Sequence, residues 1–128
     1  MNLSEQIKNI FNHHFVGYID NVYLFESDGF YKLGISTNVS DRIKNEQTGN
    51  PHEIRVIISF SATHDYCYKF EQTWHNRLVD YNKRGEWFYL PPILLDKVIS
   101  QMRDRQNLFD LVIQAIQSNG KPSIWNIL

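Results

Sequence analysis

Two short apolar runs on either side of a tight turn constrain the fold of this chain more than any other feature of its sequence. The runs Val22 to Phe25 and Phe30 to Ile35 are rich in β-branched and aromatic residues, and Ser27-Asp28-Gly29 between them is typical of a turn. Strand-forming runs so closely linked predict a β-hairpin. A chain of 128 residues is long enough for one hydrophobic core, so we expect the hairpin to belong to a single domain spanning residues 1–128.

Helical and strand patterns follow one another along the rest of the chain. Apolar residues spaced three and four apart predict helices, and β-branched or aromatic runs predict strands. The expected helices cover residues 3–15, 39–46, 66–80 and 93–118, with Asn107 as a joint in the last, and further strands cover 54–60 and 86–90. We expect N-caps within 36–38 and at Thr63 or Asp65, and a turn at Lys83-Arg84-Gly85. These elements predict an α+β fold: a small sheet flanked by helices, with a core at about 17–90 and helical additions at both ends.

Charge and cysteine content narrow the class of protein. Thirteen Lys and Arg residues stand against 14 Asp and Glu residues, a net charge of −1, which excludes a protein that holds duplex DNA by bulk positive charge alone. Cys67 is the only cysteine, so no intramolecular disulfide can form, and we expect a reducing, cytoplasmic setting. No apolar run approaches the roughly 18 residues of a membrane-spanning helix, so we expect no membrane partner.

Four side chains within the expected core have the chemistry for phosphodiester hydrolysis. Tyr23 supplies a phenol, Lys32 and Arg42 supply positive charge, and Glu71 supplies a carboxylate. One carboxylate can hold a hydrated Mg²⁺ (or Mn²⁺), because such an ion binds through few protein ligands and keeps several waters. The ion activates water and offsets charge on the leaving oxygen; Arg and Lys stabilise the transition state, and a phenolate or neutral lysine accepts the proton of water.

The order and spacing of these residues resemble the GIY-YIG nuclease superfamily, over roughly residues 17–90. The sequence runs that carry the resemblance are Val22-Tyr23-Leu24, Lys32-Leu33-Gly34-Ile35-Ser36, Asp41-Arg42-Ile43, Gln47-Thr48-Gly49-Asn50-Pro51 and Gly85-Glu86-Trp87-Phe88, together with Glu71. They look like the phage and meiotically-up-regulated-gene branch of the superfamily. The resemblance implies a small metal-dependent DNA endonuclease or nickase with a GIY-YIG-like sheet.

The resemblance also implies a role for each matching residue. Tyr23 matches the first motif tyrosine, the proton acceptor or the phenol that orients water. Arg42 matches the catalytic arginine, and Glu71 matches the single metal-binding carboxylate. Gly34 matches the motif glycine, where the strand passes close to a neighbour. Lys32 stands where most members have a second tyrosine, although lysine is common there in this branch.

The sequence does not identify the general base. Glu46 stands where many members carry a His or Tyr that helps to activate water. His75 follows Glu71 by four residues, so the two share a helix face. One hypothesis makes His75 a phosphate or metal-shell contact or the general base. The other makes it a histidine packed beside Trp74 with a satisfied hydrogen bond.

Several basic residues are expected to contact a nucleic-acid backbone. They are Lys32, Arg42, Lys44, Arg77, Lys83 and Arg84. Glu86 either reaches the site or pairs with Arg84.

Two functions from different classes remain open at this stage. The first is a DNA endonuclease or nickase that uses Mg²⁺ or Mn²⁺ with Tyr23, Lys32, Arg42, Glu71 and His75 as its catalytic set. The second is a catalytically weak or inactive DNA-binding or assembly module that keeps the nuclease fold. The apolar face of the C-terminal helical segment, 93–118, also leaves room for a homodimer or a partner-protein contact.

Overall fold

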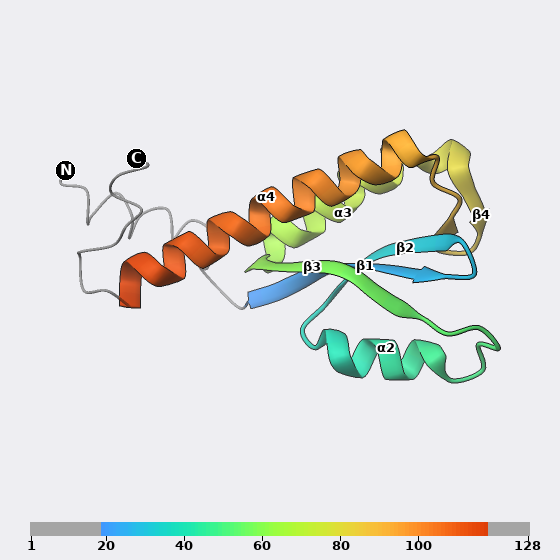
Figure 1. The fold of residues 1–128 in the computed structure, drawn as a ribbon, viewed down its shortest axis with the longest axis horizontal. Helices are drawn as coiled ribbons and strands as arrows, with labels where there is room; N and C mark the ends of the chain where they lie inside the picture. The colour runs from blue at the N-terminus through green and yellow to red at the C-terminus, as the bar shows by residue number, and fades with distance from the viewer. Residues whose placement is uncertain (1–18, 118–128) are drawn as a thin grey trace.

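A five-stranded antiparallel sheet organises the part of the chain that the computed structural model describes, residues 19–117 (Figure 1). The strands lie in the order β3-β1-β2-β5-β4. Their bounds are β1 Ile19–Ser27, β2 Phe30–Ser36, β3 Arg55–Thr63, β4 Asn82–Arg84 and β5 Trp87–Phe88. The predicted hairpin is confirmed: β1 and β2 pair antiparallel, and Asp28 and Gly29 between them have φ values of 52° and 82°. Two successive positive φ values are typical of the tight turns that match the twist of a hairpin.

Helices cover both faces of this sheet. Helix α2 (Val39–Gln47) lies on one side, and α3 (His64–Arg77) and α4 (Pro92–Gln117) lie on the other (Figure 1). A single 3-10 turn, η1 (Val79–Tyr81), follows α3. The predicted α+β class is therefore confirmed. The expected helix at 3–15 lies outside the described residues.

Alternation along β1 divides the core into two layers. Val22 and Leu24 point to the side of α3 and α4, where they join the larger buried cluster. Tyr23 and Phe25 point to the opposite side and form a smaller cluster with Ile54. Since successive strand residues face opposite ways, β1 is apolar on both faces and sits at the centre of the fold.

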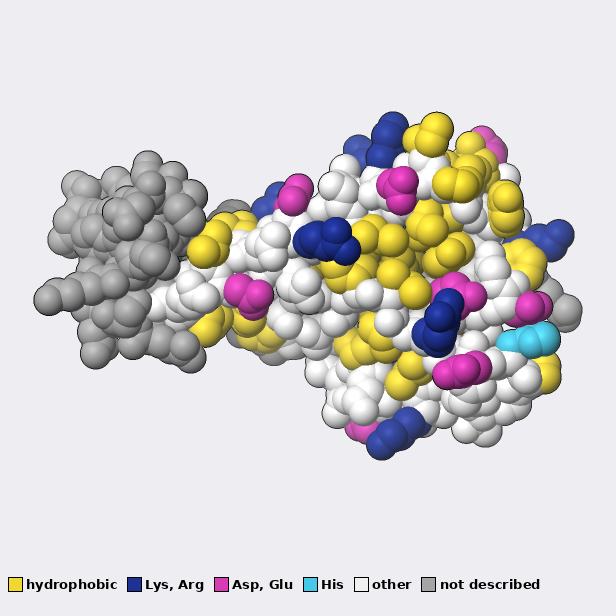
Figure 2. All heavy atoms as spheres, viewed as in Figure 1, with side chains coloured by type: hydrophobic (Ala, Val, Ile, Leu, Met, Phe, Trp, Pro, Cys, Tyr) yellow, Lys and Arg dark blue, Asp and Glu magenta, His cyan; other side chains and the backbone are white. Residues whose placement is uncertain are grey.

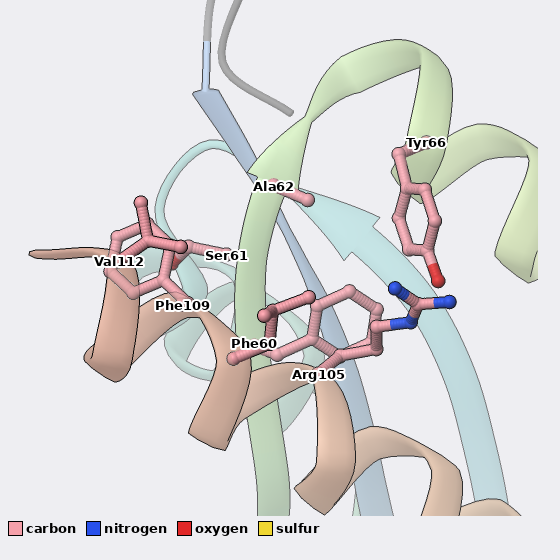
Figure 3. A pocket seen from close by; sticks show the side chains of 8 residues that line it. Phe60, Ser61, Ala62, Tyr66, Arg105, Phe109 and Val112 are labelled. Carbon is pink, nitrogen blue, oxygen red and sulfur yellow. The ribbon is translucent and has the colours of Figure 1, made fainter. Parts of the chain in front are cut away.

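Helix α4 packs along β3 and is held by side-chain hydrogen bonds. Gln106 donates to the backbone oxygen of Ser59 at 3.0 Å, and Trp74 of α3 donates through Nε1 to Gln101 at 3.0 Å. Between α4 and β3 lies a hollow of about 10 Å³, next to which Arg105 points its guanidinium group at Tyr66 (Figure 3). That volume is about the size of one water molecule, so the hollow is no ligand site.

The structure corrects four element boundaries. Helix α4 runs unbroken through Asn107, because that exposed residue costs little helix propensity and the buried stripe continues from Met102 to Val112. Helix α3 ends at Arg77 instead of 80, since Leu78 turns into the core as its C-cap.

The third and fourth corrections concern the second half of the sheet. The predicted turn at 83–85 is wrong: residues 82–84 form β4, and the turn falls at Gly85 and Glu86, where Gly85 takes a φ of 60° that favours glycine. The strand predicted at 86–90 is only Trp87–Phe88. In residues 19–117, no helix is long and apolar enough to cross a membrane.

Candidate functional site

Tyr23 and Gly34 are direct cross-strand partners on the α2 side of the sheet. The Tyr23 side chain is buried, and its ring stacks on Phe25 with centroids 4.0 Å apart. A Cβ atom at position 34 would lie 2.3 Å from the Tyr23 hydroxyl oxygen. Glycine at 34 therefore makes the space that the Tyr23 phenol occupies, which is the close approach that the motif predicted.

Lys32 lies two residues before Gly34 and is held by two carboxylates. Its ammonium group contacts Glu46 of α2, and it lies 2.9 Å from Oε2 of Glu86 in the turn between β4 and β5. Lys32 is only 5% exposed, and burial alone would lower the pKa of its ammonium group. The hydrogen bonds from Glu46 and Glu86 outweigh burial and raise the pKa, so Lys32 stays charged.

Arg42 adds an exposed positive charge one helical turn before Glu46. Its helix begins at Asn38, whose side chain accepts a hydrogen bond from the Asp41 amide at 3.0 Å, as the predicted N-cap requires. Burial raises the pKa of the Tyr23 phenol, and the charges of Lys32 and Arg42 only partly offset that rise. Tyr23 is therefore a neutral phenol at physiological pH.

Glu71 and His75 approach from the opposite side of the sheet, on α3. His75 Nε2 lies 2.7 Å from the backbone oxygen of Leu33 in β2. Strand β5 pairs with β2 at Tyr31, and in the described chain no strand pairs with β2 beyond it, so His75 lies along the free edge of β2. Because residues four apart share a helix face, Glu71 lies one turn further along this edge.

The contacts of His75 are specific. A carbonyl oxygen can only accept, so Nε2 carries the hydrogen, and in the neutral ring Nδ1 is the acceptor. The ring packs at 5.6 Å from Phe88. One of the two hypotheses for His75 expected a satisfied hydrogen bond, which the structure shows. Its partner, Leu33, was not predicted, because the two residues are 42 apart in the chain.

Glu86 links the two sides of the site. Its pKa is lowered by the hydrogen bond to Lys32 and by the charge of Lys32, and the charge of Arg42 on α2 lowers it further. Glu86 reaches Lys32, one of the residues that the sequence predicted for the site. Its position beside Trp87-Phe88 in the family-like run was the sequence signal for this role.

The other predicted contact residues are spread over separate surfaces. Lys44 is exposed on α2. Arg77 stacks at 5.0 Å on the Trp74 ring, beside α4, whereas Lys83 lines a groove next to α2. Arg84 lies in β4, opposite Trp87. On the face drawn in Figure 2, Lys and Arg side chains are scattered among Asp and Glu and form no continuous basic patch.

The donor set fits a cation that keeps most of its waters. In residues 19–117, no group of three or more His, Cys, Asp and Glu side chains is arranged to hold a metal ion. Glu71 is half-buried, and its Oε1 accepts a hydrogen bond from Gln72 at 3.3 Å. A single carboxylate of this kind suits Mg²⁺, which binds through one or two carboxylates and is otherwise hydrated.

The chain forms a small α+β domain whose antiparallel sheet carries helices on both faces. The candidate site lies around β2, the second strand of the sheet. The sequence pattern of one protein family, described as the T5orf172 domain, matches residues 15–103, and the chain belongs to this family, a GIY-YIG-related nuclease-like domain. Searches of the curated proteins and of the solved structures find no match to the chain.

Proposed function

We propose that this protein is a metal-dependent DNA endonuclease or nickase that hydrolyses phosphodiester bonds. One observation carries the proposal: a phenol on β1, an exposed guanidinium on α2, and an imidazole and a carboxylate on α3 lie on three elements that pack against β2. Membership of a nuclease-like family supports it. The lysine in place of a second tyrosine favours the phage and meiotically-up-regulated-gene branch.

Arg42 is the residue proposed to meet the scissile phosphate. Its side chain is exposed, whereas that of Lys32 is buried and its charge is countered by Glu46 and Glu86. A guanidinium donates two parallel hydrogen bonds to phosphate oxygens and stabilises the charge that develops on them. Lys32 is better suited to positioning Glu46 and Glu86 than to binding the substrate.

His75 is the proposed proton acceptor. The neutral Tyr23 phenol and the charged Lys32 ammonium both hold their protons at physiological pH. Nδ1 of His75, by contrast, is left with a free lone pair when Nε2–H donates to Leu33. Tyr23 then orients the attacking water by hydrogen bonding, and His75 takes the proton.

Glu71 is the proposed holder of Mg²⁺ or Mn²⁺. The bound cation supplies Lewis-acid stabilisation of the phosphate charge. The protein's own part is to keep the Glu71 carboxylate beside His75 on the same face of α3.

A second candidate function is a binding module without turnover, and a specific contact favours it. Lys32 is surrounded by two carboxylates, which reduce the positive charge available to a phosphate at the centre of the site. Such a site stabilises the charge of a phosphodiester transition state poorly, which would leave binding without cleavage.

Incubation of the full chain with supercoiled plasmid distinguishes the two functions. The endonuclease proposal predicts open-circular or linear product with Mg²⁺ or Mn²⁺ at low salt and none with EDTA. Retarded but intact plasmid with either metal would support the binding module instead.

A further inference from the structure

A groove runs from Glu46, the partner of Lys32, to the turn of the β1–β2 hairpin. None of the roles assigned so far uses this groove. Its volume is about 760 Å³, within the range of small-molecule sites. Glu46, which holds Lys32, lines its inner end. The remaining walls come from the hairpin turn, the loop between α2 and β3, and the β4–β5 hairpin.

The groove offers aromatic rings on which a base can stack and a positively charged lysine side chain. Phe30 and Trp87 line it, and both rings are half-buried, so part of each faces solvent. Lys83 is exposed at its rim, and His52 lies beside it with 56% of its side chain exposed. An aromatic surface next to a cation suits a nucleobase and its phosphate.

Two of the three walls of the groove are held by hydrogen bonds. On the α2–β3 loop, Gln47 donates to the backbone oxygen of His52 at 2.9 Å and accepts from the Ile54 amide at 2.8 Å. On the hairpin turn, Glu26 accepts from the Gly29 amide at 3.1 Å. His52 Nε2 on the loop lies 3.5 Å from Oδ2 of Asp28 on the hairpin turn. A recess with braced walls binds a ligand at low ordering cost.

A second hollow on the described surface offers no such open ring. It lies between α3 and α4, and its aromatic residue, Trp74, is 3% exposed and covered by Arg77. That hollow offers no open ring for stacking.

We propose that the groove binds an unpaired nucleotide of the substrate strand, so that the protein acts on single-stranded or locally unpaired nucleic acid. This inference rests on the proposed function, since the groove adjoins the site assigned to cleavage. A base would stack on Phe30 and Trp87, and its phosphate would meet Lys83. Stacking on aromatic rings adds affinity that does not depend on a basic surface, which agrees with the near-neutral charge of the chain.

Equilibrium binding in EDTA tests the groove without testing cleavage. Fluorescence anisotropy of a labelled oligothymidine is compared with that of a duplex of the same length. We expect the single strand to bind at least tenfold more tightly than the duplex. Phe30→Ala is expected to weaken it about tenfold, as for loss of one stacked base, and Lys83→Gln to weaken it less and to reduce the salt dependence.

Matched variants control for charge, ring loss and folding. Lys97→Gln removes an exposed lysine from α4, and Tyr68→Ala removes an exposed ring from α3, so neither should change the affinity. Trp87→Phe keeps an aromatic ring in the groove and should remove most of the tryptophan quenching on binding. Circular dichroism melting confirms that each variant is folded.

The outcomes separate this inference from the proposed function. Equal affinity for duplex and single strand would contradict the proposed role of the groove. Unchanged affinity in folded Phe30→Ala and Lys83→Gln would contradict it as well. Metal-dependent cleavage of duplex at the same rate with and without the two substitutions would contradict the proposed role of the groove. It would still support the proposed nuclease function. Groove-dependent strand binding with no cleavage in Mg²⁺ or Mn²⁺ would support the groove and contradict the nuclease.

Discussion

The Tyr23 hydroxyl occupies the space that a side chain at Gly34 would fill, with 2.3 Å between that oxygen and an ideal Cβ at position 34. The two residues face each other across β1 and β2. The phenol therefore reaches the free edge of β2 only because its partner has no side chain.

Gly34→Ala should destabilise the protein and displace Tyr23. The added methyl group overlaps the phenol, and overpacking of this kind costs about 1–3 kcal/mol of the free energy of unfolding. Urea denaturation measures the loss. Tyr23→Leu removes the clashing atoms, so the double variant should lose less than the sum of the single losses. Additive losses would contradict the clash.

His75→Gln should abolish cleavage while preserving the fold. A glutamine amide can still donate to the Leu33 oxygen from near the position of Nε2, but it offers no basic nitrogen at the position of Nδ1. We expect a melting temperature close to that of the unsubstituted protein and a cleavage rate lower by about 10²-fold or more. A folded variant that cleaves at the rate of the unsubstituted protein would show that His75 is structural.

The Lys32–Glu86 pair should make stability depend on pH on the acid side. The hydrogen bond to Lys32 lowers the pKa of Glu86 below 4.5, so near that pH the unfolded chain binds more protons than the folded chain. The free energy of unfolding should fall as the pH drops from about 5 through the folded pKa of Glu86. Glu86→Gln should flatten this dependence, and Glu53→Gln, at an exposed position, should not. If the free energy of unfolding depended on pH in the same way with and without Glu86→Gln, the Lys32–Glu86 pair would contribute nothing to stability.

Cys67 should resist thiol reagents in the native state. Its side chain is fully buried, and burial is the main cause that raises the pKa of its thiol to about 12. Because Cys67 is the only cysteine, its labelling reports unfolding directly. We expect no modification in neutral buffer and one label per chain in denaturant, measured by mass spectrometry. Rapid native labelling would mean that the α3 side of the core opens.

Local signals in the sequence predicted the elements that local chemistry controls. The hairpin turn at Asp28-Gly29 and the N-caps Asn38 and Thr63 depend on neighbouring residues, and each is confirmed. The strand β4 was missed, because its three residues Asn82–Arg84 carry no apolar pattern and pair only through the short β5.

Sequence patterns could not predict contacts between elements that lie far apart in the chain. The sequence predicted Tyr23, Arg42 and Glu71 by order and spacing, and those roles stay predictions. That Glu46 and Glu86 would both hold Lys32 depends on how α2 and the β4–β5 turn fold back onto β2. Glu46 stands where many family members carry a His or Tyr, and the structure gives its carboxylate a partner in Lys32.

The most direct test of the central claim is the rate of plasmid cleavage under single-turnover conditions for two matched pairs of variants. Glu71→Gln and Arg42→Gln alter the free edge of β2, whereas Glu53→Gln and Arg103→Gln make the same chemical changes at exposed positions elsewhere. We predict rates lower by about 10²-fold or more for the first pair, with Mg²⁺ present, and parent rates for the second. Equal rates for all four folded variants would contradict a catalytic site at the free edge of β2.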